Sequence, residues 1–209
     1  MKNTLNISKT AKFVTYGNPK TAKTIMFVLH GYGQLADYFI RKFNMLNEND
    51  YFVVAPEGLH RFYLKGASGR VGASWMTKEE RQSDIDDYVK YLDLLWASIS
   101  KKYSFDYKIL LGFSQGGATA SRWHNEGQFK ANQFLLWAAV FPDDMNLNFS
   151  NKFELSDNYF ILGNNDEYIT IEKGEQHIIE INKKSIDFQF VKFSGKHTIE
   201  SKTLLNLIL

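Results

Sequence analysis

The sequence predicts an α/β fold in which helices cover both faces of a mostly parallel central sheet. Segments with strand-like and helix-like patterns alternate along the chain. Several of the strand-like segments are solid blocks of Ile, Val, Leu and Phe, as expected for parallel strands that are covered on both faces. In addition, the pentapeptide Gly112-Phe113-Ser114-Gln115-Gly116 joins an apolar run to a stretch of small residues that predicts a helix.

The expected elements follow from these patterns. The clearest helix is 83–102, because Ile85, Leu92 and Ile99 recur at helical spacing and acidic residues occupy its first turn. The chain has no internal repeat or linker, so we expect a single domain over 1–209. Strands are expected at 11–16, 24–29, 52–55, 107–111, 133–140, 159–162 and 188–193, and the other helices at 35–46, 115–126, 170–182 and 199–208.

The composition excludes several classes of function. Hydrophobic residues make up 44% of the chain, which is typical of a folded globular protein, and the net charge of +2 favours neither nucleic acid nor an anionic membrane. There is no cysteine, so disulfides and thiol nucleophiles are excluded, and no clustered His/Asp/Glu set predicts a metal. Since no apolar segment resembles a signal peptide or a membrane span, we expect a cytoplasmic protein without stable membrane insertion.

Ser114 is the predicted nucleophile. A Gly-x-Ser-x-Gly pattern between a strand and a helix forces a sharp turn that exposes the serine hydroxyl above the sheet. Side chains two residues before and after the serine would collide in that turn, and Gly112 and Gly116 avoid the collision. The first free N–H groups of the next helix then point to where a carbonyl oxygen becomes negative during acyl transfer.

A serine nucleophile needs a base and an acid that orients the base. In the α/β-hydrolase order of nucleophile, acid and histidine, the base follows the last strand, and His197 has this position. Asp166 follows the strand at 159–162 and is the favoured acid. Asp143 or Asp144, one strand earlier, is the alternative, because some hydrolases place the acid there.

The oxyanion hole and the pocket are predicted from two loops. The backbone amides of Gln115 and Tyr32 are the expected donors, and Gly31 allows the early loop to approach the nucleophile closely. His30, in the same loop, is expected to bond to backbone and not to act as the base. The long loop 56–82 should border the same face of the sheet, and we expect Gly31, Trp75 and Met76 to line the substrate pocket.

Together these motifs resemble the phospholipase/carboxylesterase family of α/β-hydrolases, which includes the acyl-protein thioesterases. The resemblance implies a serine hydrolase of carboxylic esters that uses no cofactor and acts on a small-molecule ester. It also implies a Ser114, Asp166 and His197 triad, with the Tyr32 and Gln115 amides as the oxyanion hole. The matching segments are Leu29-His30-Gly31-Tyr32-Gly33, Ala55-Pro56, Gly112-Phe113-Ser114-Gln115-Gly116-Gly117, Gly163-Asn164-Asn165-Asp166 and Gly195-Lys196-His197.

The sequence departs from this family at two places. Glu167-Tyr168-Ile169 stands where family members often have Val-Pro shortly after the aspartate, and Trp75 lacks the aromatic-then-acid pair of the acyl-protein thioesterases. The second departure counts against a thioesterase substrate but not against hydrolase chemistry. The alternative functions are an acyl thioesterase and an amidase or peptidase that uses the same triad. A non-catalytic binding protein with a hydrolase fold is a further one, although no triad member is missing.

Overall fold

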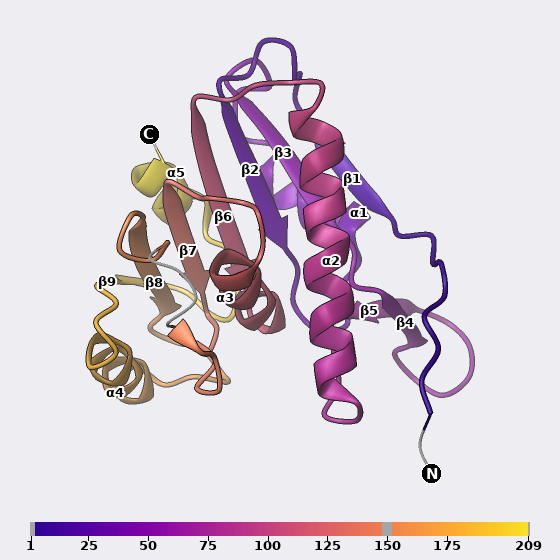
Figure 1. Cartoon of the computed structure of the whole chain (residues 1–209). Coiled ribbons are helices and arrows are strands. Elements are labelled where there is room, and N and C mark those ends of the chain that lie inside the picture. The colour runs from indigo at the N-terminus through magenta and orange to yellow at the C-terminus, as the bar shows by residue number, and fades with distance from the viewer. Residues whose placement is uncertain (1–2, 148–151, 209) are drawn as a thin grey trace.

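In the computed structural model, which describes residues 3–147 and 152–208, a seven-stranded sheet forms the centre of the molecule (Figure 1). The strand order is β1-β3-β2-β6-β7-β8-β9, and every neighbouring pair is parallel except β1 and β3. This confirms the predicted mostly parallel sheet. The strands are β1 (Phe13–Tyr16), β2 (Thr24–Leu29), β3 (Tyr51–Pro56), β6 (Tyr107–Phe113), β7 (Gln133–Trp137), β8 (Asp157–Gly163) and β9 (Phe188–Phe193).

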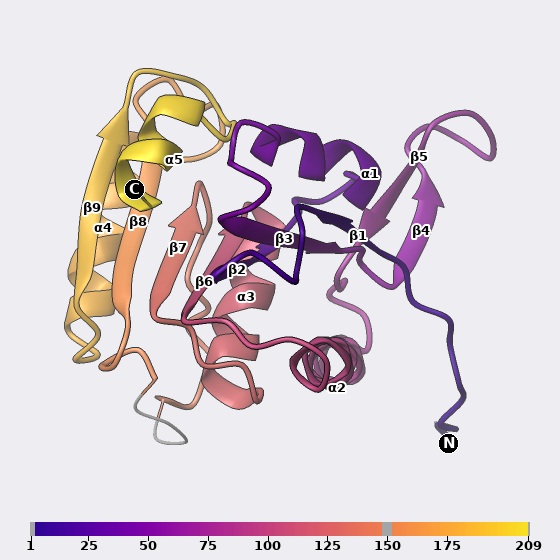
Figure 2. The same cartoon turned by 90° about the horizontal axis from the view of Figure 1, so that it is seen from above.

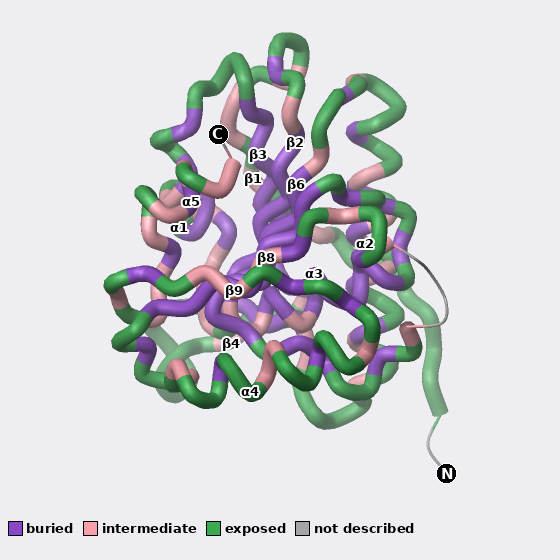
Figure 3. Tube along the Cα trace, turned by 90° about the vertical axis from the view of Figure 1, so that its left-hand side faces the viewer, coloured by how far each residue is buried: buried purple, intermediate pink, exposed green. Residues whose placement is uncertain are grey.

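Helices cover both faces of the sheet, as Figure 2 shows. On one face lie α2 (Arg81–Ser100) and α3 (Gln115–Glu126). The opposite face carries α1 (Ala36–Phe39), its 3-10 continuation η1 (Ile40–Phe43) and α5 (Ser201–Ile208). The remaining helix, α4 (Ile171–Asn182), packs along β8 and β9. The strands between these layers are the buried centre of the chain (Figure 3).

The longest helix, α2, follows the expected amphipathic pattern. Ile85, Leu92 and Ile99 are buried, while most of the intervening residues are exposed or half-buried. The helix begins two residues before the expected position 83 and ends at Ser100, before the two lysines that were expected to close it. Within the described residues, no helix combines the length and the apolar composition that crossing a membrane requires.

The expected long loop contains a β-hairpin that the sequence did not predict. Its strands are β4 (His60–Tyr63) and β5 (Val71–Ser74), which pair in antiparallel register and form a separate two-stranded sheet. Ala73 also forms an isolated antiparallel bridge with Gln34, in the loop after β2. The hairpin is therefore attached to the loop that was expected to form the oxyanion hole.

The direction of the crossovers changes between β2 and β6. After β2 the chain moves to β3 on one side, whereas β7, β8 and β9 follow β6 on the other side. In open α/β sheets, the crevice at such a change lies beyond the carboxyl ends of the strands and is where ligands bind. The loop after β2 and the turn after β6, which carry Tyr32 and Ser114, meet at this crevice.

Candidate active site

Ser114 occupies a sharp turn between β6 and α3. Its backbone angles, φ 54° and ψ −123°, are unusual for a residue with a side chain. A Cβ atom on Gly112 would lie 2.5 Å from the Gly116 carbonyl oxygen, and one on Gly116 would lie 2.2 Å from the Leu29 carbonyl oxygen. Both positions thus require glycine, for the steric reason that the sequence indicated.

Asp166, which is buried, and His197, which is half-buried, form a pair above the carboxyl ends of β8 and β9. The His197 Nδ1 atom lies 2.7 Å from Asp166 Oδ2. The Asp166 side chain has no exposed surface, and its second oxygen accepts hydrogen bonds from the Tyr168 and Ile169 amides at 2.8 and 3.0 Å. These bonds fix the carboxylate, which therefore holds His197 in the tautomer with a proton on Nδ1.

Ser114 and His197 line the same pocket, which has a volume of about 350 Å³. No hydrogen bond joins the Ser114 hydroxyl to His197 among the described side chains; such bonds often form only when a substrate is present. The other walls come from α3, the segment after β7 and the segment after β8, and most of them are small or apolar. These residues are Gln115, Ala118, Ala138, Ala139, Val140, Tyr168 and Ile169.

The loop after β2 lies against Ser114. A Cβ atom on Gly31 would lie 3.1 Å from the Cβ of Ser114, so only glycine leaves normal packing distance there. Within the described residues, the backbone amides of Tyr32 and Gln115 donate to no protein acceptor, whereas the neighbouring amides of Gly31, Gly33 and Gln34 all do. Two free donors thus border the serine, as an oxyanion hole needs.

His30 supports this loop from below, as expected for a structural residue. Its Nε2 atom accepts a hydrogen bond from the Gly58 amide at 2.9 Å, and its Nδ1 atom lies 2.8 Å from the Gly31 carbonyl oxygen. Burial lowers the pKa of His30 from its ordinary value to about 4. The imidazole is therefore neutral near pH 7 and connects two backbone segments.

Trp75 and Met76 differ from the expectation that they line the pocket. The Trp75 side chain is completely buried in the core, and its indole N–H donates to the His30 carbonyl oxygen at 2.8 Å. Neither residue lines the pocket that contains Ser114, and Gly31, which was also expected there, does not line it either. An indole is compatible with either place, and its burial and its hydrogen bond to His30 put Trp75 in the core.

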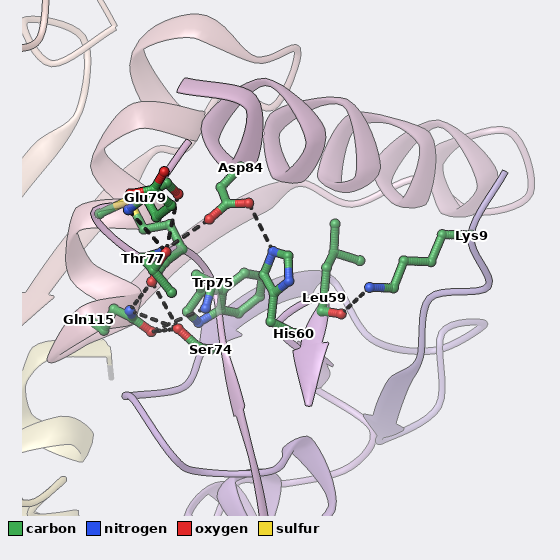
Figure 4. A network of polar contacts seen from close by, with 10 residues as sticks. Lys9, Leu59, His60, Ser74, Trp75, Thr77, Glu79, Asp84 and Gln115 are labelled. Atoms are coloured by element: carbon green, nitrogen blue, oxygen red, sulfur yellow. Dashed lines mark hydrogen bonds and ion pairs between the residues drawn. The ribbon is translucent and has the colours of Figure 1, made fainter. Parts of the chain in front are cut away.

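The Gln115 side chain has a role that the sequence analysis missed. Its Nε2 atom donates to the Met76 carbonyl oxygen at 2.9 Å and to Ser74 Oγ at 3.0 Å, and its Oε1 atom accepts from the Trp75 amide at 3.1 Å. Figure 4 shows this side chain beside Ser74 and Trp75. The residue after the nucleophile therefore ties the turn to the end of the hairpin.

Asp143 and Asp144, the alternative acids, contact other residues and not His197. Asp144 forms ion pairs with Arg81 at 2.6 Å and with Arg122 at 2.7 Å, and these contacts lower the pKa of its carboxyl to about 2. The Asp143 side chain is 82% exposed and lies 3.8 Å from Lys184. Asp166 is the carboxylate that the structure brings to His197.

Two aromatic residues beside His197 were also missed. The Phe113 ring lies 4.9 Å from the imidazole and the Tyr168 ring lies 4.6 Å from it, measured between ring centroids. Tyr168 stands in the segment where the sequence departs from the phospholipase/carboxylesterase pattern, and that departure was the signal that could have identified it. Both rings thus contact the imidazole.

Comparison with known families agrees with this arrangement. The family model described as serine hydrolase (FSH1) matches residues 20–205, which is most of the chain. The chain belongs to this serine hydrolase family. The match includes all the residues discussed above, and it confirms the expectation of a serine hydrolase. A comparison of the sequence with curated proteins gives no match.

Solved structures of other hydrolases share the fold. The hydrolase is similar to esterase PE8, with 18% identity, a TM-score of 0.68 and coverage of 95% of this chain and 99% of the other. A phospholipase/carboxylesterase from Dyadobacter fermentans gives 18% identity, a TM-score of 0.68 and coverage of 97% and 98%. Acyl-protein thioesterase 2 of Zea mays gives 13% identity, a TM-score of 0.71 and coverage of 95% and 96%. The α/β-hydrolase fold is therefore confirmed.

Proposed function

We propose that this hydrolase cleaves carboxylic esters of small molecules through an acyl-enzyme intermediate. Ser114 is the nucleophile, His197 the general base and Asp166 the carboxylate that orients the base. The observation that carries the proposal is the Asp166–His197 pair, whose imidazole lines the same pocket as the strained Ser114. Because Nδ1 of His197 faces Asp166, Nε2 is the nitrogen that takes the serine proton.

In the first half of the reaction, Ser114 Oγ attacks the ester carbonyl carbon while its proton moves to His197 Nε2. The negative charge that develops on the carbonyl oxygen is stabilised by the Tyr32 and Gln115 amides, which have no other acceptor among the described residues. Asp166 stabilises the imidazolium. The C–O bond to the alcohol then breaks, and the alcohol leaves with the proton from His197.

In the second half, a water molecule replaces the alcohol. His197 removes a proton from this water as its oxygen attacks the acyl carbon. The bond between that carbon and Ser114 Oγ then breaks, His197 returns the proton to Oγ, and the acid leaves. The methyl groups of Ala118, Ala138 and Ala139 give the pocket an apolar wall. We infer that this wall contacts an apolar portion of the substrate, since burial of apolar surface is favourable and no Asp, Glu, Lys or Arg among the described residues lines the pocket.

The test is labelling with a fluorophosphonate, which forms a covalent bond with an activated serine, followed by mapping of the labelled peptide. We expect modification at Ser114. Replacement Ser114→Ala should abolish labelling and lower kcat for a 4-nitrophenyl ester by about a millionfold if chemistry limits turnover. The matched control is Ser98→Ala on α2, which makes the same chemical change on the protein surface. A folded wild-type protein that reacts at no serine would contradict the proposal.

A further inference from the structure

A second cavity, with a volume of about 520 Å³, lies on the β2 side of the active site. Leu35, Phe39 and Val71 supply apolar surface to its walls, and Gly33 contributes backbone from the loop that carries Tyr32. Two cations, Lys42 from η1 and Arg70 from the hairpin, also line it. The pocket that contains Ser114 lies on the other side, towards β7 and β8.

The two cations have no anionic partner in the part of the chain that the structure describes. Lys42 Nζ donates one hydrogen bond, to Thr198 Oγ1 at 3.1 Å, and forms no ion pair there. The Arg70 side chain also takes part in no ion pair within those residues. No carboxylate lines the cavity. The cavity is therefore a positively charged space with unused donors.

Other cations near the loop after β2 are neutralised. Lys12 pairs with Asp37, and Arg61 donates to Glu57 at 2.8 Å. Glu57, the buried carboxylate of this region, also accepts from the Ala36 amide at 3.1 Å. Since these acids are already engaged, neither is available to neutralise Lys42 or Arg70. An anion that enters the cavity would meet an ammonium and a guanidinium, both of which form strong charge-assisted hydrogen bonds with a carboxylate.

The cavity is connected to the proposed catalytic residues in three ways. Gly33 directly follows Tyr32, the expected oxyanion donor. On the other side, Lys42 bonds to Thr198, which directly follows His197. The Phe39 ring stacks on Phe113 with centroids 6.0 Å apart, and Phe113 in turn contacts His197. The cavity thus adjoins the loop that lies against Ser114, so an anion bound in the cavity lies next to the active site.

We propose that the hydrolase acts on esters that carry a carboxylate, and that Lys42 and Arg70 bind this carboxylate. The apolar walls of the cavity contact the methylene groups between the carboxylate and the ester, while the other portion of the substrate enters the alanine-lined pocket. This inference rests on the proposed function, because it names the substrate class of the same site. The substrate is thus charged at one end and apolar at the other.

The first experiment compares kcat/KM for matched esters. One pair has the charge on the acyl portion, 4-nitrophenyl hemiadipate against 4-nitrophenyl heptanoate. The second has it on the alcohol portion, the butyrate ester of 4-hydroxybutanoate against pentyl butyrate. We expect the anionic member of one pair to be preferred about tenfold or more, which corresponds to about one charge-assisted hydrogen bond. A ratio near one in both pairs would overturn the inference.

Variants identify the residues responsible for the ratio. Lys42→Gln and Arg70→Gln should each lower the anionic-to-neutral ratio severalfold, and added NaCl should lower it in the wild type because salt screens partly exposed charges. Lys20→Gln is the matched control, since it removes the same charge from an exposed position before β2 and should leave the ratio unchanged. Thr198→Val removes the Lys42 hydrogen bond but keeps the charge, so the ratio should persist. If Thr198→Val abolished the ratio, Lys42 would act by positioning the histidine loop and the inference would be wrong.

A binding measurement separates this inference from the proposed function. Calorimetric titration of Ser114→Ala with adipate requires no turnover, and we expect binding that Lys42→Gln weakens about tenfold. Absence of fluorophosphonate labelling together with Lys42-dependent adipate binding would reject the hydrolase assignment and retain the anion site. Labelling at Ser114 without adipate binding and without a charge preference would reject the anion site alone.

Discussion

The imidazole of His197 is fixed from three directions. Asp166 holds one ring nitrogen at 2.7 Å, and the rings of Phe113 and Tyr168 contact the imidazole. Tyr168 is 76% exposed, so this contact borders solvent, whereas Phe113 is buried. A side chain with few accessible rotamers loses little entropy when it enters the transition state, and this favours catalysis.

Asp166 and Asp144 should respond differently to replacement by asparagine. Asp166→Asn should lower kcat by about ten-thousandfold, because an amide can donate to Nδ1 and then favours the wrong tautomer of His197. The measurement is steady-state hydrolysis of a 4-nitrophenyl ester, with folding checked by circular dichroism.

Asp144→Asn provides the comparison. The side chain of Arg122 is only 3% exposed and loses part of its neutralising partner in this variant. We expect a loss of about 1–2 kcal/mol in the free energy of unfolding, since Asp144 itself is half exposed, and a much smaller change in kcat. If Asp144→Asn reduced kcat more than Asp166→Asn does, Asp166 would not be the acid.

Individual site residues were predictable where topology or sterics left few options. The order of strands limited the base to a histidine after β9, and the turn after β6 required glycine on both sides of Ser114. The position of Trp75 was not predictable in this way, since tryptophan side chains line pockets and also fill cores. The structure decides between the two, because the side chain is buried and its indole N–H donates to the His30 carbonyl oxygen.

Among the elements, the turn after β6 is fastened to the hairpin by the Gln115 side chain. Replacement Gln115→Ala leaves the buried Trp75 amide without its acceptor and removes two further hydrogen bonds. We expect the free energy of unfolding to fall by about 1–3 kcal/mol in urea titrations, because an unpaired buried donor costs about that amount. Gln176→Ala on the exposed side of α4 is the control and should change it by less than about 0.5 kcal/mol. An equal, small loss in both variants would contradict this role.

The elements that sequence patterns predicted well are those with long apolar periodicity. The bounds of β2, α3 and β9 agree with the predicted 24–29, 115–126 and 188–193. The hairpin escaped prediction because β4 and most of β5 lack alternating apolar residues and depend on pairing with each other. The helix expected at 35–46 also differs, because α1 is one turn that tightens into η1 before ending at Phe43.

Across the whole molecule, two completely buried histidines make stability depend on pH. Burial lowers the pKa of His30 to about 4 and that of His124 to about 3, compared with about 6.5 in an unfolded chain. The Nδ1 atom of His124 is also buried without a hydrogen-bond partner among the described residues. Both rings therefore remain neutral in the folded protein while they become charged in the unfolded one.

As the pH falls below about 6.5, the unfolded chain takes up protons that the folded chain does not. The free energy of unfolding should then fall by up to about 1.4 kcal/mol per pH unit for each histidine, until the folded-state pKa is reached. Urea titrations between pH 7 and pH 4.5 measure this slope. His124→Phe should make it shallower, since the ring packs against Phe134 and Phe153, which an apolar ring can also do. An unchanged slope in His124→Phe would contradict the buried, neutral state.

The hairpin gives the enzyme a means of diversification that leaves its chemistry intact. Its tip, residues 65–69, is exposed and packs on nothing that the reaction needs, while its base is fixed by the Gln34–Ala73 bridge. Insertions and deletions are best tolerated at such exposed tips. Lengthening or shortening this arm would move Arg70 relative to the cavity, so descendants of one ancestral sequence can acquire new substrate preferences without any change in Ser114, Asp166 or His197.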